Sequence, residues 1–416
     1  MQWFPVGRDD SSGWRLDVVS LITILGESLM ARHIQPLTAS KLCLLPRIIP
    51  APQAFLGSTR AARLPSLPNS VCGVYSGTLV QELNYFANVL LPITTMKSFE
   101  VAIWHITLSS KILIQTMMIL KPERSFDAMA DRSRSQHPER EALVSPRTLS
   151  PLNLLTIFSS LLVLGALIWA LMLNDGVAVL ALVAIASASI LIGIASHWRP
   201  QLAARPTDAV VPKGDILIRT REGAFVIIQC TEEVARELFM GPEECNYLVS
   251  DQLFKVLGGI SLSLVTLSVI FLGNCSWTMQ AVIAVIYVML NVFYWIASLL
   301  PPSWLWDLSR YRCEEVTPQH LRNADKPKFD ESKEIESKPS FTRSLWFAIQ
   351  ATGEVEWVTV SDAAPRTPEW KTWLELAKIN CGNPDWDAVG EKDRLMKKAH
   401  HRSEAPASLP LRRETA

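Results

Sequence analysis

The amino-acid sequence predicts an α-helical membrane protein in which four transmembrane helices form two hairpins and carry small α+β modules on the cytoplasmic side. Two observations support this fold class. Four long stretches contain no charged residue, and the basic residues that flank them all fall on one side. About 20 consecutive apolar residues are needed to cross a hydrocarbon core of roughly 30 Å.

Each uncharged stretch is long enough to form one transmembrane helix. The four stretches are Leu154 to Leu173, Val177 to Ala195, Val256 to Leu272, and Met279 to Leu300. The polar turns Asn174 to Gly176 and Gly273 to Trp277 join them in pairs, and Pro301 ends the last helix because proline has no backbone N–H to donate. Four buried helices of a soluble protein are the alternative, but such helices rarely run this long without a polar face.

The orientation follows from lysine and arginine residues outside the four stretches. They lie before the first stretch, between the second and third, and after the fourth: Lys121, Arg124, Arg132, Arg134, Arg140, Arg147, Arg199, Arg205, Lys213, Lys255, Arg310, Arg312 and Arg322. The two short turns contain neither residue type. Positively charged flanks stay in the cytoplasm, so both ends of the four-span region are predicted to be cytoplasmic.

The sequence divides into eight segments along these lines. They are a poorly defined N-terminal region at 1–120, a basic cytoplasmic segment at 121–153, a transmembrane hairpin at 154–196, a cytoplasmic ββα module at 197–252, a second transmembrane hairpin at 253–302, a charged linker at 303–341, a cytoplasmic hairpin-helix module at 342–395, and a basic tail at 396–416.

The N-terminal region contains one further apolar stretch, Val101 to Leu120. It carries His105, Lys111 and Gln115, and a charge at mid-membrane costs about 2.5 to 3.5 kcal/mol. The sequence therefore favours neither alternative for Val101 to Leu120, a fifth transmembrane helix or no transmembrane helix. No acidic residue occurs between Glu27 and Glu82, which favours a disordered leader or a wrongly assigned start of the gene.

The cytoplasmic loop between the second and third spans predicts a ββα module. Asp215 to Thr220 and Ala224 to Cys230 are β-rich runs around a turn, so we expect a hairpin. A helix should begin after Thr231 as N-cap and end near Gly241. A second short helix is expected to begin at Pro242-Glu243-Glu244.

A second hairpin is predicted after the linker, from Leu345 to Ala351 and from Val355 to Val360. A helix should follow, with Thr367 as cap and Pro368 at its first position. Its tryptophans Trp370 and Trp373 are expected to pack on the hairpin rather than bind a partner. The basic residues of the tail could contact anionic lipid, and a solvated tail is the equally weighted alternative.

The sequence contains no motif for catalysis, cofactor binding or metal binding. Nucleotide-binding, zinc-protease and hydrolase motifs are absent, and the seven cysteines form no CxxC pair. We therefore expect no enzyme, no cofactor and no metal site. Forty basic and forty acidic residues balance, which argues against a nucleic-acid partner. The expected partners are the lipid bilayer and a protein on the cytoplasmic face.

One polar stripe occurs within the spans. Tyr287, Asn291 and Tyr294 share one face of the fourth span because they are spaced by four and three. Ser261, Thr266 or Ser268 of the third span is expected to face them, in an interhelical packing contact rather than a substrate site.

Three blocks of sequence resemble filamentous-fungal multi-pass membrane proteins of unknown function. They are GDILIRTREGAFVIIQCTEEVARELFMGPEECNYLV, WIASLLPPSWLWDLSRY, and FTRSLWFAIQATGEVEWV with AAPRTPEWKTWLELA. The resemblance covers roughly 150–395 and implies the four-span layout without an activity. The leading functional hypothesis is thus a membrane-embedded interaction or scaffold protein. The alternative is a small oligomeric channel or transporter in which Tyr287, Asn291 and Tyr294 line the path.

Overall fold

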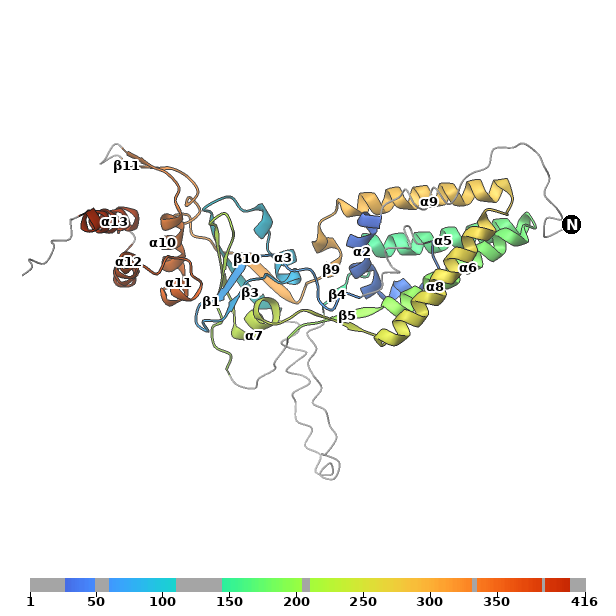
Figure 1. Cartoon of the computed structure of the whole chain (residues 1–416), viewed down its shortest axis with the longest axis horizontal. Helices are drawn as coiled ribbons and strands as arrows, with labels where there is room; N and C mark the ends of the chain where they lie inside the picture. Colours follow the sequence, from blue (N-terminus) through green and yellow to red (C-terminus); the bar gives the residue numbers. More distant parts are fainter. Residues whose placement is uncertain are drawn as a thin grey trace, which may run out of the picture. The chain divides into compact units, whose positions relative to one another are not determined.

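The computed structural model describes residues 27–48, 60–109, 144–203, 210–330, 335–383 and 386–404 (Figure 1). The chain forms two compact units, each built from three separate stretches of sequence. Unit 1 comprises Met1–Leu64, Glu141–Leu202 and Glu243–Leu308, and unit 2 comprises Pro65–Arg140, Ala203–Pro242 and Ser309–Ala416.

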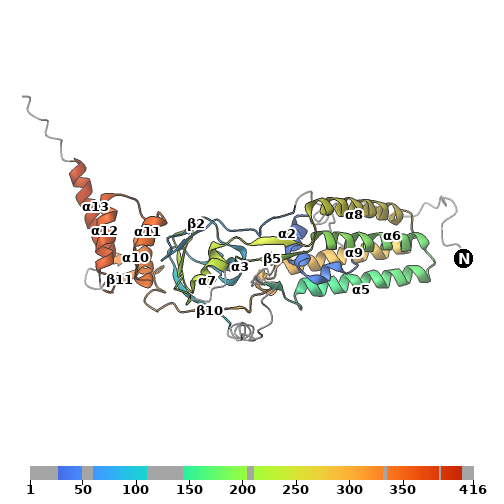
Figure 2. The ribbon, with the colours of Figure 1, turned by 90° about the horizontal axis from the view of Figure 1, so that it is seen from below.

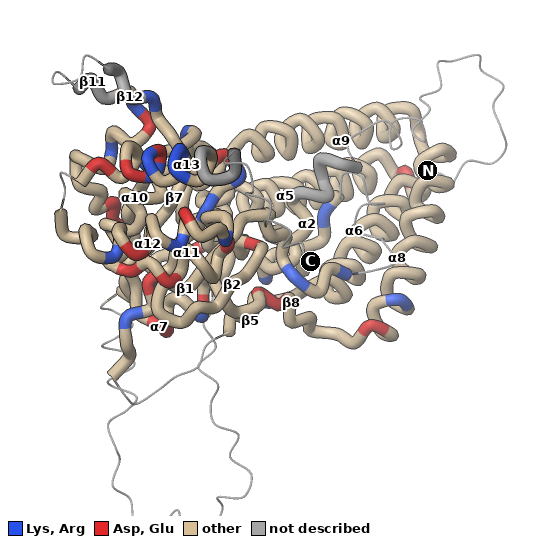
Figure 3. The backbone as a smooth tube through the Cα atoms, turned by 60° about the vertical axis from the view of Figure 1, so that its left-hand side comes forward, with Lys and Arg blue, Asp and Glu red and all other residues tan. Residues whose placement is uncertain are grey.

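Unit 1 contains four helices that are long and apolar enough to cross a membrane, which confirms the four predicted stretches. They are α5 (Pro151–Met172), α6 (Gly176–Ser196), α8 (Asp251–Leu272) and α9 (Trp277–Ser298). At 1.5 Å per residue, each is roughly 32 Å long. Their only charged residues are Asp251 and Lys255 in the first turns of α8, and the four tubes are almost entirely tan in Figure 3.

Local signals in the sequence set where these helices begin. The Ser150 side chain accepts a hydrogen bond from the Asn153 N–H, and Pro151 occupies the first turn of α5. The Asp175 side chain caps α6 in the same way by accepting from the Ala178 N–H. Such caps satisfy N–H groups that have no partner within a helix.

The four helices pack in a different order from their order along the chain. Helix α6 packs extensively along α8, while α9 packs along α5, and α5 also contacts α6 (Figure 2). Small residues such as Ala170, Ala178 and Ala181 are fully buried in the shared core, where they allow close approach of the helices.

The N-terminal segment packs into this bundle, so the prediction of a disordered leader is wrong for residues 27–48. Helix α2 (Glu27–Ala39) contacts α5 and α9, and the short helix η1 (Lys41–Leu44) contacts α5 and α6. His33, Leu37 and Arg47 are buried. The prediction failed because scattered basic and proline residues are typical of a disordered leader. The sequence alone does not show that these residues pack against α5, α6 and α9.

Four further short strands belong to unit 1. Strand β5 (Trp198–Gln201) pairs antiparallel with β8 (Glu244–Tyr247), and β4 (Ser145–Pro146) pairs with β9 (Trp306–Asp307). The helix predicted to begin at Pro242 is therefore wrong. Pairing with β5 decides the conformation of residues 244–247, and a four-residue segment has too few turns to stabilise a helix against it.

Unit 2 is built on a six-stranded sheet with the order β10-β3-β7-β6-β1-β2. The strands are β1 (Ser70–Gly73), β2 (Leu79–Val80), β3 (Val101–Leu108), β6 (Ile216–Arg219), β7 (Phe225–Gln229) and β10 (Tyr311–Glu315). The β6–β7 hairpin is confirmed, but it lies inside this sheet rather than in a separate module.

Of the two alternatives left open for 101–120, strand β3 excludes a membrane span that includes residues 101–108. Residues 101–108 pair with β7 on one side and β10 on the other, so they cannot belong to a membrane helix. The alternation of strand residues between two faces explains the apolar composition, because both faces of β3 are covered. Residues 110–120 lie outside the described part of the chain.

Helices cover both faces of the sheet. Val101, Ile103 and Phe225 face a layer formed by α10 (Phe341–Thr352), α11 (Glu356–Val360), α12 (Pro368–Ile379) and α13 (Ala388–Glu404). On the opposite face lie α3 (Tyr85–Leu90), η3 (Ile93–Thr95), α7 (Glu232–Ala235) and the π-helical turn η4 (Arg236–Met240). Helix α7 with η4 fulfils the prediction of a helix from Thr231 to Gly241.

The hairpin predicted within 345–360 is wrong, because these residues form helices α10 and α11. Leu345, Ala348 and Ile349 are buried at helical spacing, and Gly353 has a φ of 72° as the residue that ends α10 rather than as a hairpin turn. Helix α12 is confirmed with its Thr367 cap. Trp370 and Trp373 are buried, as expected.

The charged linker at 303–341 contains strands. It contributes β10 to the sheet, and β11 (Lys328–Asp330) pairs with β12 (Ile335–Ser337). Residues 331–334 between them, most of the basic segment before the first span, and residues 405–416 of the tail lie outside the described residues.

The sheet of unit 2 is assembled from three stretches of the chain. Its strands come from before α5, from between α6 and α8, and from after α9. Two of the four long apolar helices lie in the sequence between each consecutive pair of these stretches.

Candidate functional site

The predicted stripe on α9 lies against α5 rather than against α8. Tyr287, Asn291 and Tyr294 are all buried, and the Asn291 amide donates to the Tyr287 carbonyl of its own helix at 2.8 Å. Of the residues expected opposite them, Ser261 donates to the Ala188 carbonyl of α6 at 2.9 Å, whereas Thr266 and Ser268 donate to carbonyls of their own helix. The stripe is thus part of the packed bundle.

Near Tyr294, at the C-terminal end of this stripe, lies an arginine that sequence reasoning missed. Arg47 follows η1 and is 1% exposed. Its Nη1 donates to the Thr156 hydroxyl of α5 at 3.1 Å, and its backbone N–H donates to the Ser189 hydroxyl of α6 at 3.0 Å. The Tyr294 side chain of α9 also hydrogen-bonds to Thr156. Arg47 therefore contacts α5 through its guanidinium and α6 through its backbone, and Tyr294 of α9 contacts the same Thr156.

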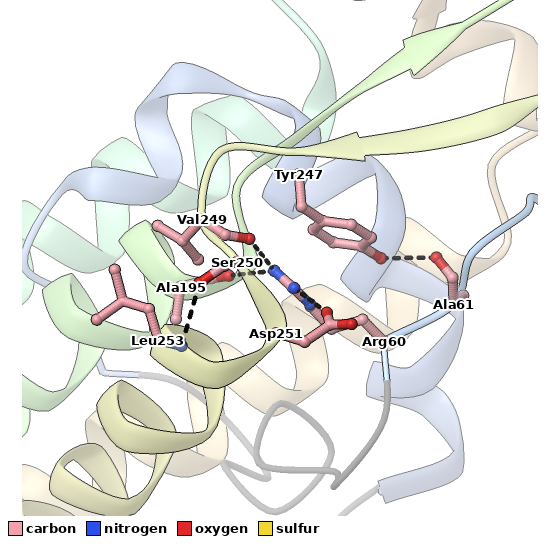
Figure 4. Close-up of polar contacts among 8 residues, drawn as sticks. All are labelled: Arg60, Ala61, Ala195, Tyr247, Val249, Ser250, Asp251 and Leu253. Carbon is pink, nitrogen blue, oxygen red and sulfur yellow. Dashed lines mark hydrogen bonds and ion pairs between the residues drawn. The ribbon is translucent and has the colours of Figure 1, made fainter.

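A second arginine, Arg60, closes the ends of α6 and α8 (Figure 4). Its Nη1 donates to the Val249 carbonyl at 2.9 Å and to the Ala195 carbonyl at 3.4 Å, and its Nη2 pairs with Asp251. The guanidinium also stacks 4.3 Å from the Tyr247 ring centroid. Cations are stabilised at the C-terminus of a helix, which is where the Ala195 carbonyl lies.

Tyr247 extends this contact on the other side. Its hydroxyl donates to the Ala61 carbonyl at 2.8 Å. Burial raises the pKa of Tyr247 to about 12, so the hydroxyl remains a donor throughout the physiological range. Arg60 and Tyr247 together fasten the chain at residues 60–61 to β8 and the start of α8.

Unit 2 contains a buried acidic group in the π-helical turn. The Glu237 carboxylate is fully buried and accepts hydrogen bonds from the Tyr311 hydroxyl and from Arg310 Nη2. Arg310 Nε approaches Oε1 to 3.0 Å without hydrogen-bond geometry. Irregular π turns often occur at functional positions. Arg310 neutralises the Glu237 carboxylate, so we interpret this contact as a structural link between η4 and β10.

A cavity of about 150 Å³ lies at the edge of the same sheet face. It is lined by Trp104 of β3, by Glu315 of β10 and by Glu100, which precedes β3. Apolar residues of the α3–η3 segment complete the lining. Glu315 is the cross-strand neighbour of Trp104. An indole face and carboxylates attract a cation, so the cavity is suited to a lysine, arginine or amine group.

The strand beside this cavity has a free edge among the described residues, because β10 pairs only with β3. The Val316 N–H donates to Ile103, and the Arg310 carbonyl accepts from Ser109. Alternate residues of an antiparallel strand turn their backbone groups toward the partner. The intervening residues Tyr311, Cys313 and Glu315 therefore direct theirs outward.

These features define an integral membrane protein with four apolar helices and a second unit in which helices cover both faces of a mixed sheet. No protein-family model matches the chain, and no curated protein and no solved structure is significantly similar to it. The resemblance to fungal multi-pass membrane proteins therefore stays a prediction. Within the described residues, no group of three or more His, Cys, Asp or Glu side chains is arranged to hold a metal ion.

Proposed function

We propose that this chain is a membrane-embedded interaction protein whose unit 2 binds an extended, basic segment of a partner protein on the cytoplasmic side. The outer edge of β10, with which no described strand pairs, is the observation that carries the proposal. Open edges readily pair with another chain, and natural proteins usually protect them. An added strand would hydrogen-bond to the outward backbone groups of Tyr311, Cys313 and Glu315.

The cavity beside the edge supports a basic partner. A lysine or arginine side chain of the added strand could enter beside Trp104 and approach Glu100 and Glu315. Glu315 also pairs with Arg322 at 3.3 Å, in a contact that is largely solvent-exposed. Exposed ion pairs contribute about 1 kcal/mol or less, so an incoming cation could displace Arg322 at little cost.

A proline substitution tests the backbone pairing. Cys313→Pro removes an outward N–H without removing a β3 hydrogen bond, and Cys313→Ala is the matched control that keeps the N–H. The probe is a fluorescein-labelled ten-residue peptide of alternating threonine and valine with a central lysine, and binding to the full chain in nanodiscs is measured by fluorescence polarisation. We expect Cys313→Ala to bind like wild type and Cys313→Pro to bind roughly fivefold or more weakly.

Charge selectivity is tested with the same assay. Glu315→Lys should weaken binding of the lysine peptide, and a peptide with central glutamate should bind poorly to wild type. Equal binding of both peptides to wild type and to every variant rejects the proposed site.

The cytoplasmic placement of unit 2 has its own test. Arg221→Cys and Lys371→Cys introduce exposed thiols in unit 2, and Asn274→Cys introduces one in the turn before α9. In sealed vesicles of known orientation, a membrane-impermeant maleimide should label the first two only from the cytoplasmic side and the third only from the opposite side. Labelling of all three from one side contradicts the orientation.

A further inference from the structure

The guanidinium of Arg47 carries a buried positive charge that no described acidic group neutralises. Its Nη2 is fully buried and has no hydrogen-bond partner among the residues that the structure describes. None of the ion pairs in the described part of the chain includes Arg47, whereas the other buried arginine of this unit, Arg60, is paired with Asp251. An arginine cannot escape this situation by losing its proton.

The neighbouring hydroxyl of Thr156 does not compensate the charge. It donates to the Leu152 carbonyl at 2.9 Å and accepts from Arg47 Nη1 at 3.1 Å, and the Tyr294 side chain is a further hydrogen-bonding neighbour. A neutral hydroxyl oxygen that accepts from Nη1 does not cancel the charge of the guanidinium. The Ser189 hydroxyl likewise donates to the Ala186 carbonyl at 2.9 Å while it accepts from the Arg47 N–H.

The depth of Arg47 makes an unneutralised charge more costly than at a soluble surface. Thr156 is the sixth residue of α5, and Tyr294 lies four residues before the end of α9. At 1.5 Å per residue, these positions lie roughly 6 to 8 Å inside the helix ends. Ionisable groups at such depths face the bundle interior and commonly mark sites for ions or substrates.

We infer that Arg47 is the binding group of a site for one small monovalent anion, such as chloride, enclosed among α5, α6 and α9. The residue is 1% exposed, with its guanidinium held by the Thr156 hydroxyl and its backbone N–H by the Ser189 hydroxyl, which leaves little room for a larger anion. Nη2 supplies the charge-assisted hydrogen bond. Tyr294, the last residue of the α9 stripe, borders the site.

Anion exchange tests the site on the full chain in detergent. Thermal unfolding is measured in sodium chloride and in sodium gluconate at equal ionic strength, because gluconate is too large for an enclosed site. A ligand that binds only the folded state raises the unfolding temperature in a saturable way. We expect chloride to raise the unfolding temperature of wild type by several degrees.

Two glutamine variants make the test specific. Arg47→Gln removes the uncompensated charge, so it should lose the chloride effect and be at least as stable as wild type in gluconate. Arg60→Gln removes a compensated arginine, so it should be less stable in both salts and keep the chloride effect. Tyr294→Phe, which keeps the shape of the side chain, should shift the chloride titration to higher concentration.

The outcomes separate the alternatives. Equal unfolding temperatures of wild type in both salts overturn the inference, as does an unchanged chloride effect in Arg47→Gln. Stabilisation by inorganic phosphate or by phosphatidylserine micelles, without stabilisation by chloride, overturns the assignment to a small anion.

Discussion

The guanidinium of Arg310 lies 3.0 Å from the carboxylate of Glu237, and this carboxylate is completely buried. Arg310 follows the fourth membrane helix, while Glu237 belongs to the loop between the second and third. The pair therefore ties the edge strand β10 to the π-helical turn η4. Tyr311, the next residue, donates a hydrogen bond to the same carboxylate.

Replacing Glu237 with glutamine should destabilise unit 2 more than removing the Tyr311 hydroxyl. Glu237→Gln leaves a largely buried guanidinium without a countercharge, and we expect the free energy of unfolding to fall by about 2 to 4 kcal/mol. Tyr311→Phe removes one hydrogen bond and should cost about 1 to 3 kcal/mol. Urea unfolding of the full chain, followed by far-UV circular dichroism, measures both. A smaller loss for Glu237→Gln contradicts the assigned roles.

Alkaline pH should destabilise wild type more than Tyr311→Phe. Burial, and secondly the charge of Glu237, raise the pKa of Tyr311 above its ordinary value. The folded state therefore holds this proton more tightly than the unfolded state does, so the stabilisation is complete below about pH 10 and is lost as the pH rises further. Urea midpoints of the two proteins between pH 8 and 11 measure the difference. A constant difference between them contradicts the prediction.

Arg60 should stabilise the folded protein through its hydrogen bonds to the Ala195 and Val249 carbonyls more than through its ion pair with Asp251. Asp251 is highly exposed, so water screens its charge and Asp251→Asn should change stability little. Arg60→Met removes hydrogen bonds to two carbonyls and the stacking on Tyr247, which we expect to cost about 2 to 4 kcal/mol. Thermal unfolding in detergent compares the two variants. Equal losses would show that the ion pair is the main contribution.

Two glycines of the membrane helices provide a matched test of whether residues 41–44 pack against α6. A Cβ at Gly193 of α6 would lie 2.3 Å from the Cys43 carbonyl oxygen, whereas a Cβ at Gly165 of α5 meets nothing within 4 Å. Gly193→Ala should therefore cost about 1 to 3 kcal/mol through overpacking. Gly165→Ala should be neutral or stabilise by up to about 1 kcal/mol. Similar unfolding temperatures for both variants would mean that residues 41–44 do not pack on α6.

Short-range signals explain which parts of the fold were predictable. The four membrane helices follow from uninterrupted apolar composition, and α12 follows from Thr367 and Pro368 at its start. The β6–β7 hairpin was found because β-branched residues flank a turn with Gly223. Helix α10 was missed because its apolar run fits a strand as well as a helix, and Gly353 serves equally in a hairpin turn and at a helix end.

The site residues were less accessible to sequence reasoning. The stripe of Tyr287, Asn291 and Tyr294 is visible because helical spacing places these residues on one face. Arg47 could not be recognised, because its importance comes from Thr156 and Ser189, which lie more than a hundred residues away. The acid-free composition of residues 28–81 was the one available signal, and it was read as a leader.

The sequence by itself determined that four apolar segments form helices of membrane-spanning length. It could do so because hydrocarbon acts on each segment independently of its neighbours. Only the tertiary structure decided that α9 packs on α5, that three distant segments form one sheet with β10 at its edge, and that Arg47 is enclosed without a countercharge among the described residues. These features depend on which surfaces meet, and no local pattern of residues records that.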